Sequence, residues 1–263
     1  MLAVIGGTGL YELFEEVKEE REINTPYGRP SSPIAIGEIA GRRVAFLPRH
    51  GKKHEYPPHE IPYKANIYAL KRIGVTRIIA PCAVGSLKPE IKPGDFVLPD
   101  QVVNFTRRED TFYDGPDTTH ISFADPFCPE LRRVIAEAAR ELDITLHSHG
   151  TVVVIQGPRF STRAESEFYQ RQGWDIINMT IYPECALARE LELCYASLSI
   201  VTDYDVGLKG RSDVKPVTAE EVIRVFRANI EKLKELLKVV IAKVPEERSC
   251  ECKRALENAR ISK

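Results

Sequence analysis

The chain has 263 residues, of which 43% are hydrophobic and 29% charged, and its formal net charge is −1 at pH 7. This composition is typical of a soluble globular protein with a large core. The small net charge argues against a nucleic-acid binder, which would carry a basic excess. No apolar run reaches the roughly 18–20 residues of a membrane span, and no basic leader precedes the first apolar run. We therefore expect a cytoplasmic protein.

Apolar runs that end in small or polar residues alternate with segments of helical periodicity. We expect strands over 2–7, 42–50, 76–86, 150–157, 175–178 and 194–201, a β-rich segment over 95–106, and helices over 62–74, 129–142, 163–172, 183–193 and 218–242. This alternation predicts an α/β fold with a parallel or mixed sheet flanked by helices. We expect a single domain over residues 1–263, with residues 246–263 as a C-terminal tail.

The chain has six cysteines, at positions 82, 128, 185, 194, 250 and 252. Free thiols are the rule in the cytoplasm. However, many charges together with only two methionines resemble the composition of a thermophile's protein, and hyperthermophiles do form cytosolic disulfides. The tail motif is CxC rather than CxxC, with no second pair at zinc-finger spacing, so we expect no metal.

Residues suited to binding an anion follow several expected strands. GGTG (6–9) can form a backbone nest with the hydroxyl of Thr8 beside it, and PRHGKKHEYPPHE (48–60) places Arg49 next to His50. A guanidinium beside an imidazole suits a phosphate oxyanion. Each motif alone could also be a tight turn or an exposed basic loop. Because strand ends line one crevice in open α/β sheets, we expect these motifs to meet there with Ala83, Met179, Thr180 and Asp203.

A longer pattern is more specific than any single motif. IGGTGLYE, PRHGKKHEYPPHEIPYKANIYALK, CAVGSLKPEIKPGDFVLPDQ, TFYDG, ADPFCPELR, IQGPRFSTRAES and INMTIYPECALARELELCYASLSIVTDYD occur in this order. Together they resemble the methylthioadenosine phosphorylase branch of the purine nucleoside phosphorylases, over about residues 2 to 245. The resemblance implies the nucleoside phosphorylase fold with a partly barrel-like mixed sheet. It also implies a homo-oligomer, either a trimer or a dimer of trimers, that binds a nucleoside and orthophosphate without a metal or organic cofactor.

The resemblance also implies roles for individual residues, which are transferred position by position. Phosphate is assigned to Thr8, Arg49, His50, Cys82, Ala83 and Thr180, and the nucleoside to Phe160, Met179, Asp203, Tyr204 and Asp205. Specificity is assigned to Ser161, Ala219, His54 and His120, of which His120 is lent across the subunit interface. The position of Cys82 usually carries Thr, Ser or Asn in the family. A thiol is a poorer donor than these side chains, so phosphate affinity should depend more on Ala83 N–H and Arg49.

The resemblance implies phosphorolysis, in which orthophosphate attacks C1′ of a purine nucleoside such as methylthioadenosine and releases the base and a ribose 1-phosphate derivative. The acidic pair after strand 194–201 fits the chemistry of this reaction. Side chains two residues apart on an extended segment project to the same side, and two neighbouring carboxylates raise the pKa of one of them. We predict that Asp203 donates a proton to N7 of the purine and is the catalytic residue, while Asp205 reads the 6-position. An ionised Asp205 favours 6-aminopurines and therefore methylthioadenosine. A protonated Asp205 would permit inosine or guanosine.

Two other classes of protein remain open at this point. A hydrolytic nucleosidase would need no phosphate, and a non-catalytic binding module would release no base. For the cysteines we hypothesise disulfides between Cys128 and Cys194, and between Cys185 and either Cys250 or Cys252.

Overall fold

The computed structural model describes residues 1–7, 10, 16–116, 118–208 and 214–260. These residues form a mixed sheet of eleven strands with helices on both sides. The strands are β1 Leu2–Gly6, β2 Glu16–Arg21, β3 Ile34–Ile39, β4 Arg42–Pro48, β5 Arg77–Ser86, β6 Phe96–Val97, β7 Gln101–Phe105, β8 Leu146–His147, β9 Thr151–Ile155, β10 Ile176–Asn178 and β11 Cys194–Asp203. The helices are α1 Tyr63–Arg72, α2 Pro129–Glu141, α3 Arg163–Arg171, α4 Ile181–Glu190, α5 Ala219–Ala228 and α6 Ile230–Lys243, followed by the short 3-10 helix η2 Glu251–Arg254.

Strand β5 pairs with β1, β10 and β11 and so joins the two branches of the sheet. One path runs β2-β3-β4-β1-β5-β10-β9-β7, and a second branch leaves β5 through β11 and β6 to β8. Strands β1 and β11 are parallel to β5, whereas β10 is antiparallel to it. The expected α/β fold with a mixed sheet is therefore confirmed.

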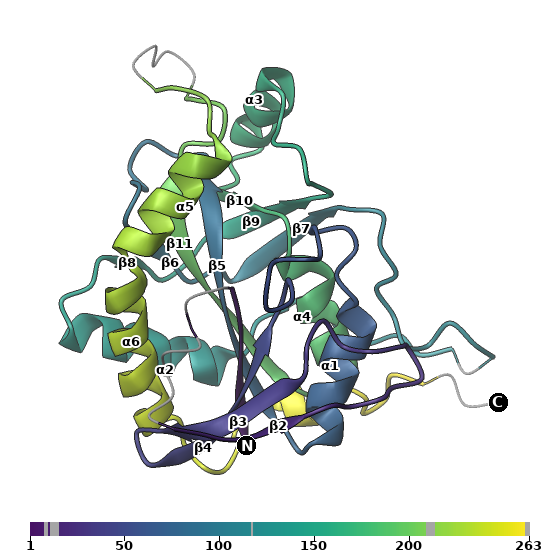
Figure 1. Cartoon of the computed structure of the whole chain (residues 1–263). Coiled ribbons are helices and arrows are strands. Elements are labelled where there is room, and N and C mark those ends of the chain that lie inside the picture. The colour runs from purple at the N-terminus through teal and green to yellow at the C-terminus, as the bar shows by residue number, and fades with distance from the viewer. Residues whose placement is uncertain (8–9, 11–15, 117, 209–213, 261–263) are drawn as a thin grey trace.

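The alternation of apolar residues along the strands builds two cores. On β1, Leu2 and Val4 pack with residues of α2 and α6, while Ala3 and Ile5 pack with residues of α1 and α4. Successive side chains of a strand point to opposite faces, so a strand that is apolar throughout needs cover on both sides. Figure 1 shows α2 and α6 along one flank of the sheet and α1 and α4 along the other.

Two features of the fold differ from the sequence predictions. The expected single helix over 218–242 is two helices, because the chain breaks at Asn229, whose backbone leaves helical geometry (φ −108°, ψ 3°) and whose Nδ2 donates to the carbonyl of Val225 at 2.9 Å. Strands β2, β3 and β8 were not predicted. Among the described residues, no helix is long and apolar enough to span a membrane.

The C-terminal segment packs against the body of the protein as far as residue 260. Arg77 donates to the carbonyls of Glu246 and Glu247 at 3.1 and 2.7 Å. The carboxylate of Glu130 accepts from the backbone N–H and the hydroxyl of Ser249 at 2.9 and 2.6 Å. Two buried charged side chains therefore hold the segment that leads to the CxC motif.

The predicted disulfides are wrong. All six cysteines are free thiols in the structure, so neither hypothesised disulfide is present. Cys185 cannot pair with Cys250 or Cys252, because it packs in the core on the α4 face while they pack in the core on the α2 face. The spacing argument against a metal site considered the sequence alone, whereas the fold gathers Cys128, Cys194, Cys250 and Cys252 into one group; the absence of a metal stays a prediction.

Candidate active site

A cavity of about 810 Å³ opens where several strands end. The predicted site residues that line it are Arg49, His50, His54, Cys82, Ala83, Phe160, Met179, Thr180, Asp203 and Asp205. Thr8 lies outside the described residues, although its neighbour Gly7 lines the cavity. The chain thus brings together ten of the predicted residues from five separate segments.

The strand ends meet at this cavity, but not because all of the strands run parallel. In a parallel sheet all carboxyl ends share one edge, but β10 runs antiparallel to β5 and has only three residues. It ends beside the middle of β5, where Asn178 donates from Nδ2 to the carbonyl of Ala83 at 2.9 Å. The Oδ1 atom of Asn178 accepts from the backbone N–H groups of Thr180 and Ile181 at 2.6 and 2.7 Å. Asn178 therefore fixes Thr180 at the start of α4.

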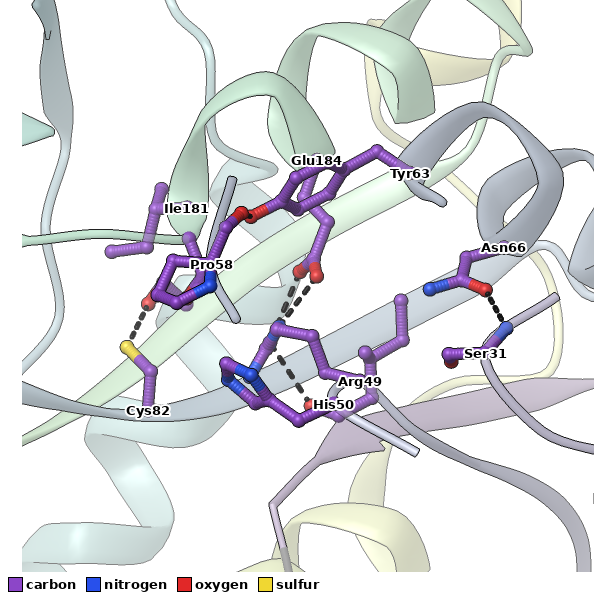
Figure 2. A network of polar contacts seen from close by, with 12 residues as sticks. Ser31, Arg49, His50, Pro58, Tyr63, Asn66, Cys82, Ile181 and Glu184 are labelled. Atoms are coloured by element: carbon purple, nitrogen blue, oxygen red, sulfur yellow. Dashed lines mark hydrogen bonds and ion pairs between the residues drawn. The ribbon is translucent and has the colours of Figure 1, made fainter. Parts of the chain in front are cut away.

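Arg49 is held by a buried acidic partner that the sequence analysis missed (Figure 2). Its Nε and Nη2 donate to the carboxylate of Glu184 at 2.5 and 3.0 Å, and the exposed fractions of Arg49 and Glu184 are 2% and 0%. Nη1 donates to the carbonyl of Pro81 at 3.1 Å and Nη2 to that of Ile5 at 3.2 Å. One N–H of Nη1 has no acceptor among the described residues and remains for a ligand.

The charge of Glu184 keeps Arg49 ionised. Burial alone would lower the pKa of the guanidinium, but the adjacent carboxylate outweighs burial and raises it. The phenol of Tyr195 donates to the same carboxylate at 2.8 Å. Because the charges of Arg49 and Glu184 nearly cancel, Arg49 presents a single hydrogen-bond donor to the cavity rather than an unpaired positive charge.

His50 is neutral in this structure. Burial, together with the charges of Arg49 and His54, lowers its pKa to about 4, against an opposing effect of the backbone contact with Tyr56. Its Nδ1 lies 2.8 Å from the carbonyl of Tyr56. A carbonyl can only accept, so Nδ1 carries the hydrogen and Nε2 is an acceptor. The ring also stacks on His54 with centroids 4.3 Å apart.

The thiol of Cys82, on β5, lies beside two serine hydroxyls of the neighbouring strand β11. Its Sγ lies 3.4 Å from the hydroxyl of Ser197 and 3.5 Å from that of Ser199. Burial raises its pKa, so the group is a neutral thiol. Cys82 therefore brings neither charge nor a strong donor to the cavity, as the sequence comparison with Thr, Ser and Asn predicts.

Asp203 ends β11 at a point where the register with β5 shifts. Its Oδ1 accepts from the backbone N–H of Asp205 at 2.7 Å, and its Oδ2 accepts from the hydroxyl of Thr202 at 2.7 Å. Burial raises its pKa to about 6, more than these hydrogen bonds lower it. A group with this pKa can carry a proton near neutral pH and release it to a base, which is what a general acid requires.

Asp205 stands in the left-handed region at φ 51° and is 2% exposed. Its Oδ2 is buried and has no hydrogen-bond partner in the part of the chain that the structure describes. Burial raises the pKa of Asp205, which outweighs the opposing effect of the nearby Ser166 and Ser161 hydroxyls. A buried oxygen without a partner is costly, so this atom is placed to accept a hydrogen bond from a ligand.

Apolar side chains form the other walls of the cavity. Phe160 and Met179 line it, together with Val222, Ile223 and Phe226 of α5. Gly157, at φ 62°, allows Met179 its position, because a Cβ there would lie 2.7 Å from the Met179 sulfur. The cavity therefore combines an apolar lining with a few polar groups, as small-molecule sites do.

Four predicted residues are not among those that line the cavity. The hydroxyl of Tyr204 lies 3.5 Å from the carbonyl of Pro89. Ala219 is the exposed first residue of α5. Ser161 is buried, and its hydroxyl lacks a partner among the described residues. The backbone of His120 donates to the carbonyl of Ala259 at 2.7 Å. Their roles remain predictions.

The sequence analysis missed Glu184, Asn178 and Gly85. For Glu184 the only signal was a carboxylate inside an otherwise apolar helical segment, PECALA. Asn178 positions Thr180, and Gly85 leaves room for the carboxylate of Asp203 on the neighbouring strand. Neither had a comparable signal in the sequence, because these roles depend on contacts with distant strands.

Comparison with known proteins identifies the class. Residues 1–242 match the model of the phosphorylase superfamily, and the chain belongs to this family. It is 58% identical over 252 residues to S-methyl-5'-thioadenosine phosphorylase of Pyrococcus furiosus, covering 95% of both chains. It is 48% identical over 266 residues to a protein of Streptomyces coelicolor named purine nucleoside phosphorylase, covering 97% of this chain and 94% of that one.

Solved structures agree with this class. Methylthioadenosine phosphorylase from Schistosoma mansoni in complex with adenine is similar, with a TM-score of 0.91, 35% identity and 98% of both chains covered. A variant of the Schistosoma enzyme in complex with methylthioadenosine gives a TM-score of 0.90 at 36% identity, again with 98% of both chains covered. The chain is thus similar to enzymes of one reaction class in sequence and in fold.

Proposed function

We propose that this protein catalyses the phosphorolysis of S-methyl-5'-thioadenosine to adenine and 5-methylthioribose 1-phosphate. The observation that carries the proposal is the pair of groups at the end of β11, where the protonatable Asp203 stands beside the partnerless buried Oδ2 of Asp205. Arg49 at the end of β4 faces the same cavity. Strands β4 and β11 are three strand spacings apart, about 14 Å, which leaves room for a nucleoside and one phosphate.

Orthophosphate takes the Arg49 end of the cavity. The free N–H on Nη1 of Arg49 donates to its oxygens, and so does the hydroxyl of Thr180, which turns away from its long 3.4 Å contact with Oδ1 of Asn178. Nε2 of the neutral His50 accepts the hydrogen of hydrogen phosphate, which orients the ion without adding charge. Thr8 is expected to add its hydroxyl. No metal or organic cofactor takes part in the proposed reaction, and phosphate is the second substrate.

The chemical step exchanges one bond for another. A phosphate oxygen forms a bond with C1′ of the ribosyl group as the bond from C1′ to N9 of adenine breaks. The electron pair of the broken bond moves onto the purine, and Asp203 donates its proton to N7, so adenine leaves as a neutral molecule. The phosphate dianion stabilises the positive charge that develops on the ribosyl group.

The 6-position of the base is read by Asp205. The 6-amino group of adenine can donate to the partnerless Oδ2, which satisfies a buried acceptor. A 6-oxopurine would place its own acceptor against this oxygen, and discrimination against such a mismatch is large. The apolar residues of α5 provide a wall for the methylthio group, which needs no hydrogen-bond partner.

Two measurements test the proposal. Base release should depend on added phosphate, and phosphate-independent release would indicate a hydrolytic nucleosidase instead, while absence of base release would indicate a binding module. Values of kcat/KM for methylthioadenosine, adenosine, inosine and guanosine should then rank methylthioadenosine first. A higher value for inosine would contradict the proposed substrate.

A preference for 6-oxopurines is the second candidate. It is supported by the Streptomyces coelicolor relative named purine nucleoside phosphorylase and by the raised pKa of Asp205. A protonated Asp205 would donate to O6 of inosine or guanosine. The same four substrates decide between the candidates.

We also propose that the enzyme is a homo-oligomer, a trimer or a dimer of trimers, in which His120 of the partner subunit completes the site. In support, His120 is not among the residues that line the cavity of its own chain. Phe105 and Phe168, which are 45% and 39% exposed, pack near Tyr169 and Trp174 as an apolar surface patch. Such a patch is typical of an interface. Light scattering after size exclusion tests the assembly, and a monomer with full activity would contradict it.

A further inference from the structure

Four cysteines from three distant segments of the sequence gather at one point of the fold. The sulfur atoms of Cys128, Cys194, Cys250 and Cys252 all lie within 4.8 Å of one another. Cys128 precedes α2, Cys194 begins β11, and Cys250 and Cys252 flank the start of η2. All four are buried, with exposed fractions of 1%, 0%, 7% and 2% in that order.

We propose that these four thiolates bind one Zn²⁺ ion as a closed structural site. Zinc bound to four cysteines is tetrahedral with Zn–S bonds of about 2.3 Å, which sets the six S–S separations at about 3.8 Å. The present separations are close to this value, since all of them lie within 4.8 Å and the one between Cys194 and Cys250 is 3.3 Å. Two disulfides would need only two short separations, whereas here all six are short.

The surroundings of the sulfurs suit a negatively charged cluster. A zinc ion with four thiolates carries a charge of −2, and donors around the ligands stabilise it. The backbone N–H of Leu131, in the first turn of α2, donates to Sγ of Cys128 at 3.5 Å. Nη1 of Arg189 donates to Sγ of Cys252 at 3.5 Å. The helix N-terminus and the guanidinium thus donate to two different members of the group.

The chain also holds the CxC motif in place independently of any metal. Arg77 binds the carbonyls of Glu246 and Glu247, and Glu130 binds Ser249, the residue before Cys250. Glu130 belongs to the same first turn of α2 that follows Cys128. These contacts hold the segment that carries Cys250 and Cys252 against the start of α2, which follows Cys128. They therefore reduce the loss of conformational entropy that opposes metal binding.

The proposed zinc site is separate from the reaction. None of its four cysteines lines the cavity, and Cys194 and Asp203 stand at opposite ends of the ten-residue strand β11, about 30 Å apart. The ion would join the start of α2, the start of β11 and the C-terminal segment. We therefore expect zinc to affect stability far more than turnover.

The test uses the tag-free full-length protein, purified without oxygen in the presence of a non-thiol reductant. Elemental analysis should find about one zinc per chain. After removal of zinc, addition of Co²⁺ alone should give the visible bands of a tetrahedral thiolate site. The Cys250→Ser/Cys252→Ser variant should lose the metal and unfold at a lower temperature. The matched control is Cys185→Ser, which changes a buried thiol outside the group and should retain zinc.

Several results would overturn the proposal. The first is a metal-free protein that gives no cobalt bands, and the second is a protein that contains iron in place of zinc. The third is a protein whose four cysteines form two disulfides under these conditions, as shown by intact mass and thiol counting. If the double variant fails to fold, release of zinc from the wild-type protein by a mercurial reagent, in step with modification of four thiols, still decides the question. Zinc release without thiol modification would place the metal elsewhere.

Discussion

The carboxylate of Asp203 lies against the bare α-carbon of Gly85 on the neighbouring strand. A Cβ at position 85 would stand 2.9 Å from Oδ1 of Asp203 and 2.9 Å from Cγ2 of Ile177. Both separations are shorter than a van der Waals contact permits. The glycine therefore determines where the proposed proton donor can stand.

Gly85→Ala should lower kcat/KM for the nucleoside on the order of 10–100-fold, because a displacement of the donor by a fraction of an ångström weakens proton transfer. The KM for phosphate should change little. The matched control is Gly115→Ala, since a Cβ at Gly115 meets nothing within 4 Å. Equal activity of the two variants would show that Asp203 has room to adjust.

Asp203→Asn and Asp203→Ala should both lower phosphorolysis by on the order of 100-fold or more, because neither side chain can donate a proton to N7. Single-turnover measurement of adenine release checks this. Near-normal turnover in both variants would remove Asp203 from the proposed role.

The pKa of Asp203 predicts the pH dependence of the wild-type enzyme. The proton donor must be protonated, and the pKa of its carboxyl is about 6. With phosphate saturating, kcat/KM for the nucleoside should therefore fall as the pH rises above about 6, since this ratio reports the enzyme form to which the nucleoside binds. Asp203→Asn should lack this decline, and an identical decline in the variant would assign it to another group.

Stability should depend on the same group with a definite sign. Folding raises the pKa of Asp203 from an ordinary value of 3.8 to about 6, so its contribution to stability is present below pH 3.8 and is lost as the pH rises through about 6. The loss is about 3 kcal/mol. Asp203→Asn cannot ionise, so its Tm relative to the wild type should be higher at pH 8 than at pH 4. Thermal unfolding at both pH values tests this.

Asp205→Asn should change the choice of base. The amide can turn its NH2 group toward the ligand and donate to O6, so kcat/KM for inosine should rise relative to that for methylthioadenosine by about tenfold or more. Asp203 is unaltered in this variant, which keeps the proton donor. An unchanged ratio would show that the 6-position is read by another group.

Glu184→Gln should affect phosphate rather than the nucleoside. The variant leaves Arg49 buried without its counter-charge, which typically costs about 3–5 kcal/mol, and it frees the guanidinium to turn. We expect a lower Tm and a higher KM for phosphate, with little change in the KM for the nucleoside. Glu165→Gln is a suitable control, because Glu165 pairs with the exposed Arg159. A phosphate KM equal to that of the control would contradict the positioning role.

The sequence by itself determined much of the fold and the chemical character of the site. Apolar runs and helical periodicity placed most strands and helices within a few residues, because these patterns reflect local burial. Arg49, His50, Asp203 and Asp205 were recognisable because each follows an apolar run. The long resemblance to one family then fixed their order along the chain.

Only the tertiary structure decided which of these groups are paired and which remain for a ligand. Glu184 is 135 positions from Arg49, and Gly85 is 118 positions from Asp203; no local pattern reports such contacts. The break at Asn229 and the antiparallel β10 likewise depend on packing rather than on propensity. The same reason applies to the cysteines, whose spacing argued against a metal site until the fold brought three distant segments to one point.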